Sequence, residues 1–158
     1  MNAAIVESLD HLRPWMPWAQ TAPTVEESEA NVRKAHLEFL ARNDLRFHLF
    51  RKEDGRYVGS TGLHRMRWEV PSFEIGYWVR KSEEGKGYIT ESTEALTAFA
   101  LDVLGARRVE IRLDPTNARS RAVPERLGFE LEGVLRCDGR DPAGRLRDTM
   151  VFSKVRPE

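Results

Sequence analysis

The chain has 158 residues, and its 25 lysines and arginines balance its 25 aspartates and glutamates, so the formal net charge is zero. This length suits one domain that buries a core of its own. The balanced charge argues against direct nucleic-acid binding, which requires a basic surface, and no apolar run approaches the ~20 residues of a membrane span.

The cysteine and histidine content indicates the cellular setting. Cys137 is the only cysteine, so no intrachain disulfide can form and we expect a reducing, cytoplasmic location. Residues 1–7 lack the basic and long apolar regions of a signal peptide. The four histidines show no zinc-ligand spacing with Cys137, so no metal site is expected.

The first half of the chain predicts a helix followed by three strands. Thr24 and Glu27 form a capping-box pattern, which begins a helix that runs to about Arg42. Strands are expected over residues 45–51 and 57–63, joined by a turn at Gly55, and over residues 72–79. The apolar face of the helix is expected to include Val32, Ala35, Leu37, Phe39 and Leu40.

The second half alternates helices and strands. A helix is expected over residues 91–104 and a strand over residues 108–113. A second helix, over residues 118–127, begins at the cap residue Asn117 and ends at Gly128. Residues 129–135 and 146–155 are expected to pair as the last two strands. This order predicts one mixed α/β domain over residues 1–158.

A glycine-rich segment lies between the third strand and the next helix. It reads Glu84-Gly85-Lys86-Gly87-Tyr88-Ile89-Thr90. Glycines let the backbone approach a ligand closely, and the first N–H groups of a helix, which lack intrahelical partners, form an anion site. The segment is neither a Walker loop nor a dinucleotide fingerprint, which would need glycine at Thr90. We therefore expect a phosphorylated cofactor here.

Three segments form a pattern along the chain: residues 73–79 (FEIGYWV), 84–90 (EGKGYIT) and 117–129 (NARSRAVPERLGF). Together they resemble the GNAT N-acetyltransferase superfamily, and within it the RimJ/RimL-type ribosomal-protein acetyltransferases. Residues 12–15 and 131–136 also fit, and the segments keep the order found in the family. The resemblance implies a GNAT-like α/β fold in which two splayed central strands form an acyl-CoA cleft.

The resemblance also implies a cosubstrate and its site. Acetyl-CoA would bind between residues 72–79 and residues 108–113, with its pantetheine arm paired to exposed backbone groups and its pyrophosphate on the loop amides. The implied cofactor-binding residues are Trp78, Val79, Arg80, Glu84, Gly85, Lys86, Gly87, Tyr88, Ile89, Thr90, Asn117 and Ser120. The side chains of Tyr77 and Val79 are expected to pack in the core.

The chain departs from the family pattern in two places. Glu84 stands where Gln or Arg is usual, and Ile89 stands where a small residue is usual, so we expect weaker cofactor affinity. The usual first strand of the family has no counterpart ahead of residue 2. We expect this to leave an exposed sheet edge that favours a homodimer.

Acetyl transfer to an amine requires a base for the amine and a proton donor for the leaving thiolate. Glu74 is the candidate base, acting through a water, because burial in an apolar strand raises a carboxyl pKa. The alternative for Glu74 is a carboxylate on a half-exposed strand.

The family implies the proton donor. Pro124 stands where many members have a proton-donating Tyr, and it cannot donate a backbone bond to the Ser120 carbonyl. The RimL-type pattern implies Ser120 as donor to the thiolate. The alternatives are that Ser120 bonds its own preceding helical turn, and that Asn117 is only a helix cap.

The resemblance implies that the segment containing Trp15 and Trp18 lines the acceptor side. Trp15 and Trp18 are fixed by neighbouring prolines and would form a rigid apolar wall; packing of their loop against the sheet is the alternative. Trp68, which follows a basic stretch, is expected to edge the same groove.

These features lead to three hypotheses for function. The first is an acetyl-CoA-dependent N-acetyltransferase acting on a protein N-terminal α-amine, with a ribosomal protein as the partner that the resemblance implies. The second is acetylation of a small amine, such as a polyamine, an antibiotic or an amino-acid toxin. Glu26, Glu27 and Glu29 would supply an acidic cleft for a basic substrate, but they also fit an ordinary first helical turn. The third is a non-catalytic acyl-CoA-binding module.

Overall fold

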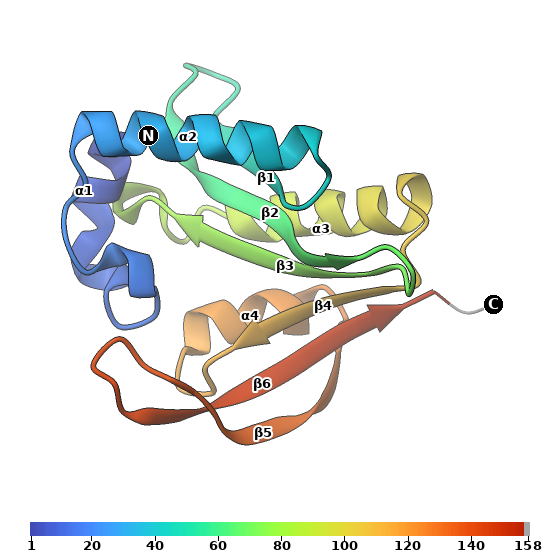
Figure 1. The fold of residues 1–158 in the computed structure, drawn as a ribbon. Helices are drawn as coiled ribbons and strands as arrows, with labels where there is room; N and C mark the ends of the chain where they lie inside the picture. The colour runs from blue at the N-terminus through green and yellow to red at the C-terminus, as the bar shows by residue number, and fades with distance from the viewer. Residues whose placement is uncertain (157–158) are drawn as a thin grey trace.

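A six-stranded mixed sheet, in the order β1-β2-β3-β4-β6-β5, runs through the protein. The computed structural model describes residues 1–156. Figure 1 shows the strands of this sheet and the helices that surround it. Their bounds are α1 Asn2–Leu12, α2 Val25–Leu40, β1 Leu45–Phe50, β2 Tyr57–Arg67, β3 Ser72–Val79, α3 Tyr88–Ala98, β4 Arg108–Leu113, α4 Ala118–Arg126, β5 Glu130–Arg140 and β6 Leu146–Val155.

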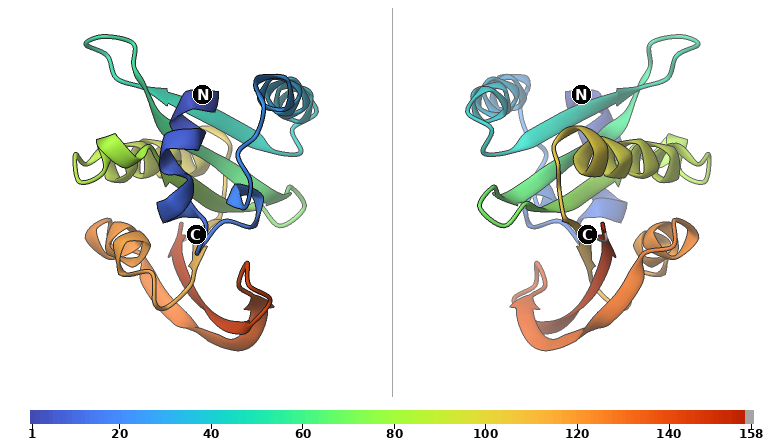
Figure 2. Two further views of the ribbon diagram at one scale, coloured as in Figure 1. Left: turned by 90° about the vertical axis from the view of Figure 1, so that its left-hand side faces the viewer. Right: turned by 90° about the vertical axis from the view of Figure 1, so that its right-hand side faces the viewer.

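The sheet is covered on both faces. Figure 2 shows α3 and α4 on one side of the sheet and α2 on the other, with α1 across one end of the strands. The largest group of buried apolar side chains lies between the sheet and α3, and it includes Phe73, Ile75, Val109, Ile111 and Phe152. A smaller cluster from α1 and the following loop packs against Trp78. Residues of β3 therefore contribute to both clusters, Phe73 and Ile75 to the larger one and Trp78 to the smaller one.

The mixed α/β architecture is confirmed, and so is the capping box that begins α2. The Thr24 side chain accepts a bond from the Glu27 amide, and the Glu27 carboxylate accepts one from the Thr24 amide. The expected apolar face of α2 is wrong at Leu37 and Leu40, which are both 66% exposed. Only part of this helix is packed against the sheet, through residues such as Ala35 and Phe39.

Four elements differ from the expectation. Two are strands that run further than expected: β2 ends at Arg67 and not at residue 63, and β5 ends at Arg140 and not at residue 135. The other two are helices. The helix α1 was not predicted, although Ile5, Leu9 and Leu12 form a buried face at helical spacing. The expected helix over residues 91–104 begins earlier, at Tyr88, and ends in a π-helical turn over Phe99–Val103. No helix within residues 1–156 has the length and apolar character that crossing a membrane requires.

Candidate active site between the splayed strands

The parallel strands β3 and β4 separate after a short paired stretch. Residues 72–74 pair with residues 108–110, and no pairing with β4 follows on β3. β4 instead continues its antiparallel ladder with β6 to the end. The gap that opens between the strands is visible in Figure 1. Backbone groups of β3 after Glu74 therefore face this gap without ladder partners from β4.

The glycine loop leads directly into α3 beside this gap. Gly85 and Gly87 have φ values of +74° and +84°, in the left-handed region that favours glycine. Gly87 is the N-cap of α3, and no side chain caps the helix. The first amides of α3 are therefore free to bind an anion. Open space also lies beside both glycines, because no atom lies within 4 Å of a Cβ built on either.

A cavity of about 820 Å³ connects the glycine loop to the gap, and we call it the loop cavity. It is walled by the end of α1, the end of β3, the loop and the beginnings of α3 and α4. Of the residues expected to bind the cofactor, all but Arg80 and Lys86 line it: Trp78, Val79, Glu84, Gly85, Gly87, Tyr88, Ile89, Thr90, Asn117 and Ser120.

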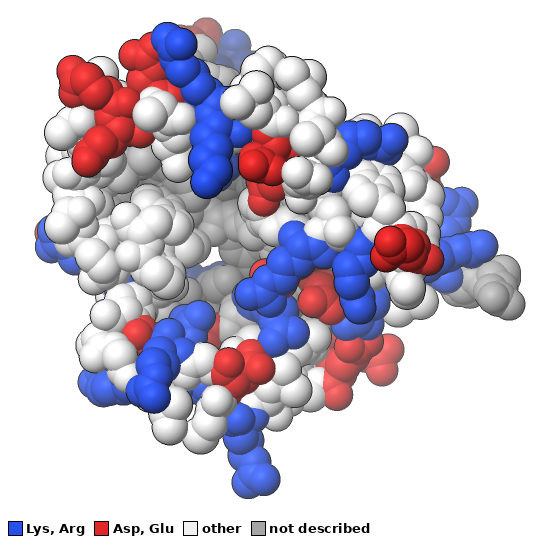
Figure 3. All heavy atoms as spheres, in the orientation of Figure 1, with Lys and Arg blue, Asp and Glu red and all other residues white. Residues whose placement is uncertain are grey.

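A second cavity of about 700 Å³, the sheet cavity, lies on the side of α1 and α2. Its walls include Trp18, Glu27, His48 and His64. The two cavities have three lining residues in common, which are Met16, Tyr77 and Trp78. Figure 3 shows the surface hollowed between the part of the molecule that carries β1–β3 and the part that carries β4–β6. The two cavities therefore have part of their walls in common, at Met16, Tyr77 and Trp78.

Ser120 lies where the loop cavity reaches Tyr77. Asn117 caps α4, its side-chain oxygen accepting a bond from the Ser120 amide at 3.1 Å. Pro124 cannot donate to the carbonyl four residues before it, which is that of Ser120. The Tyr77 hydroxyl donates to that carbonyl at 3.0 Å and lies 3.2 Å from Ser120 Oγ. Burial raises the pKa of Tyr77 to about 12, so this hydroxyl keeps its proton at neutral pH.

Comparison with known proteins agrees with this geometry. The sequence model of the acetyltransferase (GNAT) domain family, Acetyltransf_3, matches residues 3–130. The chain belongs to the GNAT acetyltransferase family.

Relatives within the GNAT family include proteins named for ribosomal acetylation. The chain is 40% identical over 105 residues to the "Putative ribosomal N-acetyltransferase YdaF" of Bacillus subtilis strain 168. That match covers 66% of this chain and 57% of YdaF, so the chain matches little more than half of that relative's length.

Two solved structures superpose on nearly the whole of this chain. A structure described as "Probable acetyltransferase" superposes with a TM-score of 0.89 at 29% identity, over 98% of this chain and 85% of the other. Mycobacterium smegmatis RimJ, in complex with CoA-disulfide, superposes with a TM-score of 0.86 at 25% identity, over 98% of this chain and 75% of RimJ. The GNAT-like fold with splayed central strands is confirmed.

Glu84, the unusual residue of the GNAT loop, is neutralised by its neighbours. Arg119 Nη1 lies 2.7 Å from one of its oxygens, and Lys81 Nζ lies 2.7 Å from the other. Burial acts to raise the pKa of Glu84, but the Lys81 bond and the charges of His11 and Arg119 outweigh burial and lower the pKa. Glu84 thus holds two cations at the edge of the loop cavity, which offsets its own charge toward an anion.

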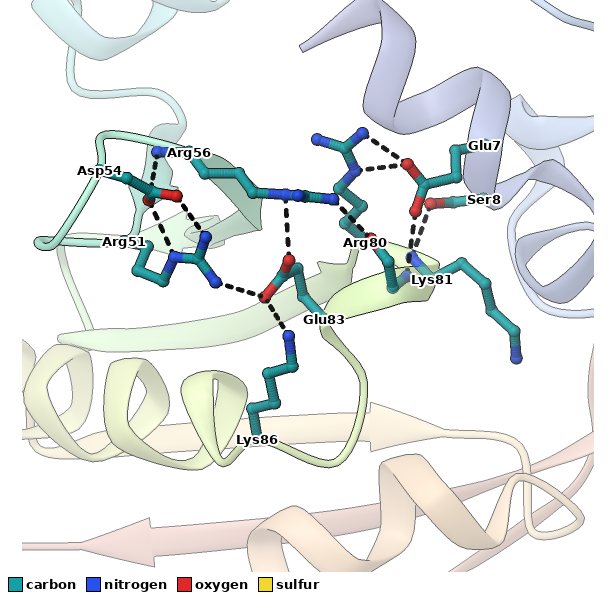
Figure 4. Close-up of polar contacts among 10 residues, drawn as sticks. Glu7, Ser8, Arg51, Asp54, Arg56, Arg80, Lys81, Glu83 and Lys86 are labelled. Carbon is teal, nitrogen blue, oxygen red and sulfur yellow. Dashed lines mark hydrogen bonds and ion pairs between the residues drawn. The ribbon is translucent and has the colours of Figure 1, made fainter.

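The segment before the glycine loop is fastened by two groups of ion pairs (Figure 4). Glu83 is 2% exposed, and its oxygens lie 2.9 Å from Lys86 Nζ and 3.0 Å from Arg56 Nε. Lys86 is therefore paired with Glu83. Arg80 likewise binds Glu7 of α1, with Arg80 Nε 2.6 Å from Glu7 Oε2. The side chains of Arg80 and Lys86 therefore position the loop, which is why neither lines the cavity.

Removal of the Glu7 charge is expected to destabilise the protein in a pH-dependent way. Hydrogen bonds from the Arg80 side chain and from Ser82 lower the pKa of Glu7 to about 2. Because the folded-state pKa is depressed, this stabilisation is complete above the unfolded value of about 4.3. It is lost as the pH falls from there toward about 2.

Thermal unfolding between pH 2 and pH 7 tests this expectation. Glu7→Gln should lower Tm at pH 7 and flatten the fall of Tm below about pH 5. The control is Glu53→Gln, which changes an exposed turn residue and should give the same dependence of Tm on pH as the parent protein. Parallel curves for the parent and Glu7→Gln would show that Glu7 contributes nothing to the acid transition.

The Tyr77 hydroxyl is expected to stabilise α4 because of Pro124. Tyr77→Phe leaves the part-buried Ser120 carbonyl without this donor, which should cost about 1 kcal/mol in the free energy of unfolding. In a Pro124→Ala background the helix regains an N–H for that carbonyl, so the same substitution should cost less. Denaturant unfolding of the four proteins in this cycle measures the difference. Equal costs in both backgrounds would contradict the pairing of Tyr77 with the carbonyl that Pro124 frees.

The structure does not bring Glu74 to either cavity. Glu74 lies at the paired end of β3, opposite Glu110, before the strands separate. Its Oε2 is 3.2 Å from Arg65 Nη1. Burial raises the pKa of Glu74, while the charge of Arg65 opposes that rise. The ion pair directs this carboxylate to Arg65, and Glu74 lines neither cavity.

The three tryptophans expected on the acceptor side are separated by the fold. Trp18 lines the sheet cavity and packs edge-on against Trp78. Trp15 lines the loop cavity instead. Trp68 lines neither cavity, because it packs on Phe73 and its indole N–H donates to the Arg42 carbonyl at 3.0 Å. Only Trp18 of the three lies in the sheet cavity.

Sequence reasoning missed two polar groups of the site. The Tyr77 ring packs against the core as expected, but its hydroxyl reaches Ser120. His64 lines the sheet cavity, and its ring lies over two glycines. The signal for Tyr77 was present in Pro124, which requires a substitute donor for the Ser120 carbonyl. The signal for His64 was a pair of glycines, Gly62 and Gly76, in neighbouring strands.

Proposed function

We propose that this chain is an N-acetyltransferase that moves the acetyl group of acetyl-CoA to a primary amine by direct attack in a ternary complex. The acceptor in this proposal is a protein N-terminal α-amine. One observation carries the proposal: the loop cavity and the sheet cavity are both lined by Tyr77 and Trp78, beside the gap between β3 and β4. A donor and an acceptor held in the two cavities would react where they meet.

The loop cavity suits CoA in both shape and donor set. The free amides at the start of α3 are suited to a pyrophosphate, and the open space beside Gly85 and Gly87 leaves room for it. The backbone of β3 beyond Glu74 offers unpaired groups to the amides of the pantetheine arm. Similarity to RimJ, which was solved with CoA-disulfide, supports this placement.

The sheet cavity favours a peptide over a polyamine as acceptor. Its lining contains one carboxylate, Glu27, and one guanidinium, Arg46, beside apolar groups such as Ile5 and Trp18. A polyamine carries several positive charges and would be favoured by several carboxylates. A single terminal amine on a largely uncharged backbone matches this wall better. Similarity to YdaF, whose name refers to ribosomal acetylation, supports a ribosomal protein as the partner.

In this proposal Ser120 assists the departure of the thiolate. Its hydroxyl lies at the wall of the loop cavity and contacts Tyr77, whose own proton is held by the Ser120 carbonyl. A hydroxyl in this position donates a hydrogen bond to the sulfur as the carbon–sulfur bond breaks. Bound acetyl-CoA would supply the acyl group and the leaving thiol. The protein would bind and orient the two substrates, and Ser120 would donate the hydrogen bond to the sulfur.

Thiol release from acetyl-CoA, measured with a panel of acceptors, tests the proposal. The panel contains short peptides with free Ser, Ala or Met at the N-terminus, the same peptides N-blocked, spermidine and an aminoglycoside. We expect release with free peptides and none with blocked ones. Release with the small amines alone would overturn the choice of acceptor. CoA binding without release from any acceptor would overturn the enzymatic proposal in favour of a binding module.

A further inference from the structure

An aspartate–histidine pair, of which the histidine lines the sheet cavity, lies beside β1 and β2. His64 is on β2 and lines this cavity, while Asp44 immediately precedes β1. His64 Nδ1 lies 2.5 Å from Asp44 Oδ2. Both side chains are 31% exposed. His64 is therefore reachable from the cavity, and the roles assigned so far to the residues of the site do not include this pair.

Two glycines make room for the imidazole ring of His64. Gly62 and Gly76 are direct partners in the β2–β3 ladder. A Cβ at Gly62 would lie 2.9 Å from His64 Cε1, and a Cβ at Gly76 would lie 2.9 Å from His64 Cδ2. Both distances are too short for real contacts, so any side chain at either position would displace the ring. The ring lies over this glycine pair, and Gly76 is followed directly by Tyr77.

Asp44 fixes which nitrogen of the ring carries the proton. A carboxylate accepts, so Nδ1–H donates to Asp44 and Nε2 keeps its lone pair. Within residues 1–156 no hydrogen bond occupies Nε2. An oriented imidazole with a bare Nε2, in a cavity that opens toward Tyr77, is equipped to accept a proton from a ligand.

The other candidate bases near the cavities lack this arrangement. His48 lines the same cavity, but its Nδ1 is 3.2 Å from the Tyr57 hydroxyl and no carboxylate orients it. Glu74 lies outside both cavities and is paired with Arg65. Imidazoles ordinarily titrate near pH 6.5, close to the pH at which a general base is most effective.

We propose that His64 is the general base that takes a proton from the acceptor ammonium, and that Asp44 is the positioning residue for its ring. This inference rests on the proposed acetyltransferase function and names the base of that site. It replaces Glu74 in that role.

The reaction balances with His64 in this role. Nε2 removes one of the three protons of the ammonium, directly or through a water, and the neutral amine attacks the thioester carbon. The new carbon–nitrogen bond forms, the carbon–sulfur bond breaks, and the sulfur leaves with its electron pair. A second proton from the nitrogen ends on the sulfur, with Ser120 adjacent, and the third stays on the amide. Nε2 then releases its proton to solvent.

Steady-state kinetics on variants of the full chain test this assignment. His64→Gln should lower kcat at least about 100-fold, with CoA affinity by calorimetry unchanged. The control is His36→Gln, which changes an exposed histidine of α2 and should keep the kcat of the parent protein. Unchanged kcat in His64→Gln would overturn the proposal. So would Glu74→Gln losing activity while His64→Gln retained it.

The acceptor in these assays is whichever amine of the panel the parent protein acetylates. Failure on peptides with success on spermidine would refute the proposed acceptor and still permit the His64 comparison. A wrong acceptor and a wrong base are therefore distinguishable.

Nitrogen NMR of the histidine side chains tests the pair without any turnover. The parent protein should show His64 with its proton on Nδ1 and a bare Nε2, and Asp44→Asn should shift this population toward the other tautomer. Asp44→Asn should also lower kcat while leaving the KM of the acceptor unchanged, because orientation and not binding is lost. If the uncharged His64 ring of the parent protein carried its proton on Nε2, the assignment would be overturned, whatever the acceptor.

Discussion

Gly87→Glu is expected to abolish CoA binding. Gly87 caps α3 with φ +84°, and the space beside it is open, so a glutamate there would enter the loop cavity. The new carboxylate would oppose a pyrophosphate at the positive end of the helix, where the amides are free. The glutamate would both occupy the space for the pyrophosphate and repel its negative charge, so CoA affinity should fall more than about 100-fold. Isothermal titration calorimetry with CoA measures it.

Gly105→Glu separates this effect from backbone strain. Gly105 also has a positive φ, +71°, and open space beside it, but it is exposed and lines neither cavity. A glutamate there imposes a similar conformational penalty and should leave CoA affinity unchanged. If Gly87→Glu and Gly105→Glu bound CoA with equal affinity, the placement of the cofactor at the glycine loop would be contradicted.

Ser120→Ala is expected to lower kcat about 100-fold and leave CoA affinity intact. Its hydroxyl contacts Tyr77 at the wall of the loop cavity. No hydrogen bond within residues 1–156 joins this hydroxyl to a carbonyl of its preceding turn, which would have been its role as an ordinary helix serine. The loss should therefore fall on the chemical step, as measured by steady-state rates and by calorimetry.

Ser92 provides the matched control, because it does bond its own preceding turn. Its Oγ donates to the Ile89 carbonyl at 3.2 Å, and it lines neither cavity. Ser92→Ala should keep the kcat of the parent protein. An undiminished kcat in Ser120→Ala would contradict the role of Ser120 in thiolate departure.

Local signals predicted the elements that frame the site. The Thr24 and Glu27 capping box, the Asn117 cap and the glycines before α3 each act through backbone groups a few residues away, so sequence alone predicts them. The alternating pattern of β3 predicted its bounds, Ser72–Val79, for the same reason. The loop cavity is consequently built mostly from residues that the sequence indicated.

The acceptor side depends on contacts between distant residues, which sequence patterns do not encode. Asp44 and His64 meet because β1 and β2 are antiparallel neighbours, and Gly62 faces Gly76 because of the β2–β3 register. Glu74 resembled a base in its strand, but the point at which β4 separates from β3 decides its surroundings. That point follows from tertiary packing and leaves no local pattern.

The most direct test of the central claim is the position of the acetyl group in a product peptide. A peptide with a free N-terminal serine and an internal lysine is incubated with the protein and acetyl-CoA, and tandem mass spectrometry locates the modification. Two cavities that are both lined by Tyr77 and Trp78, with a largely uncharged acceptor wall, predict acetyl on the α-nitrogen alone. Acetyl on the lysine side chain, or an unmodified peptide, would contradict the account.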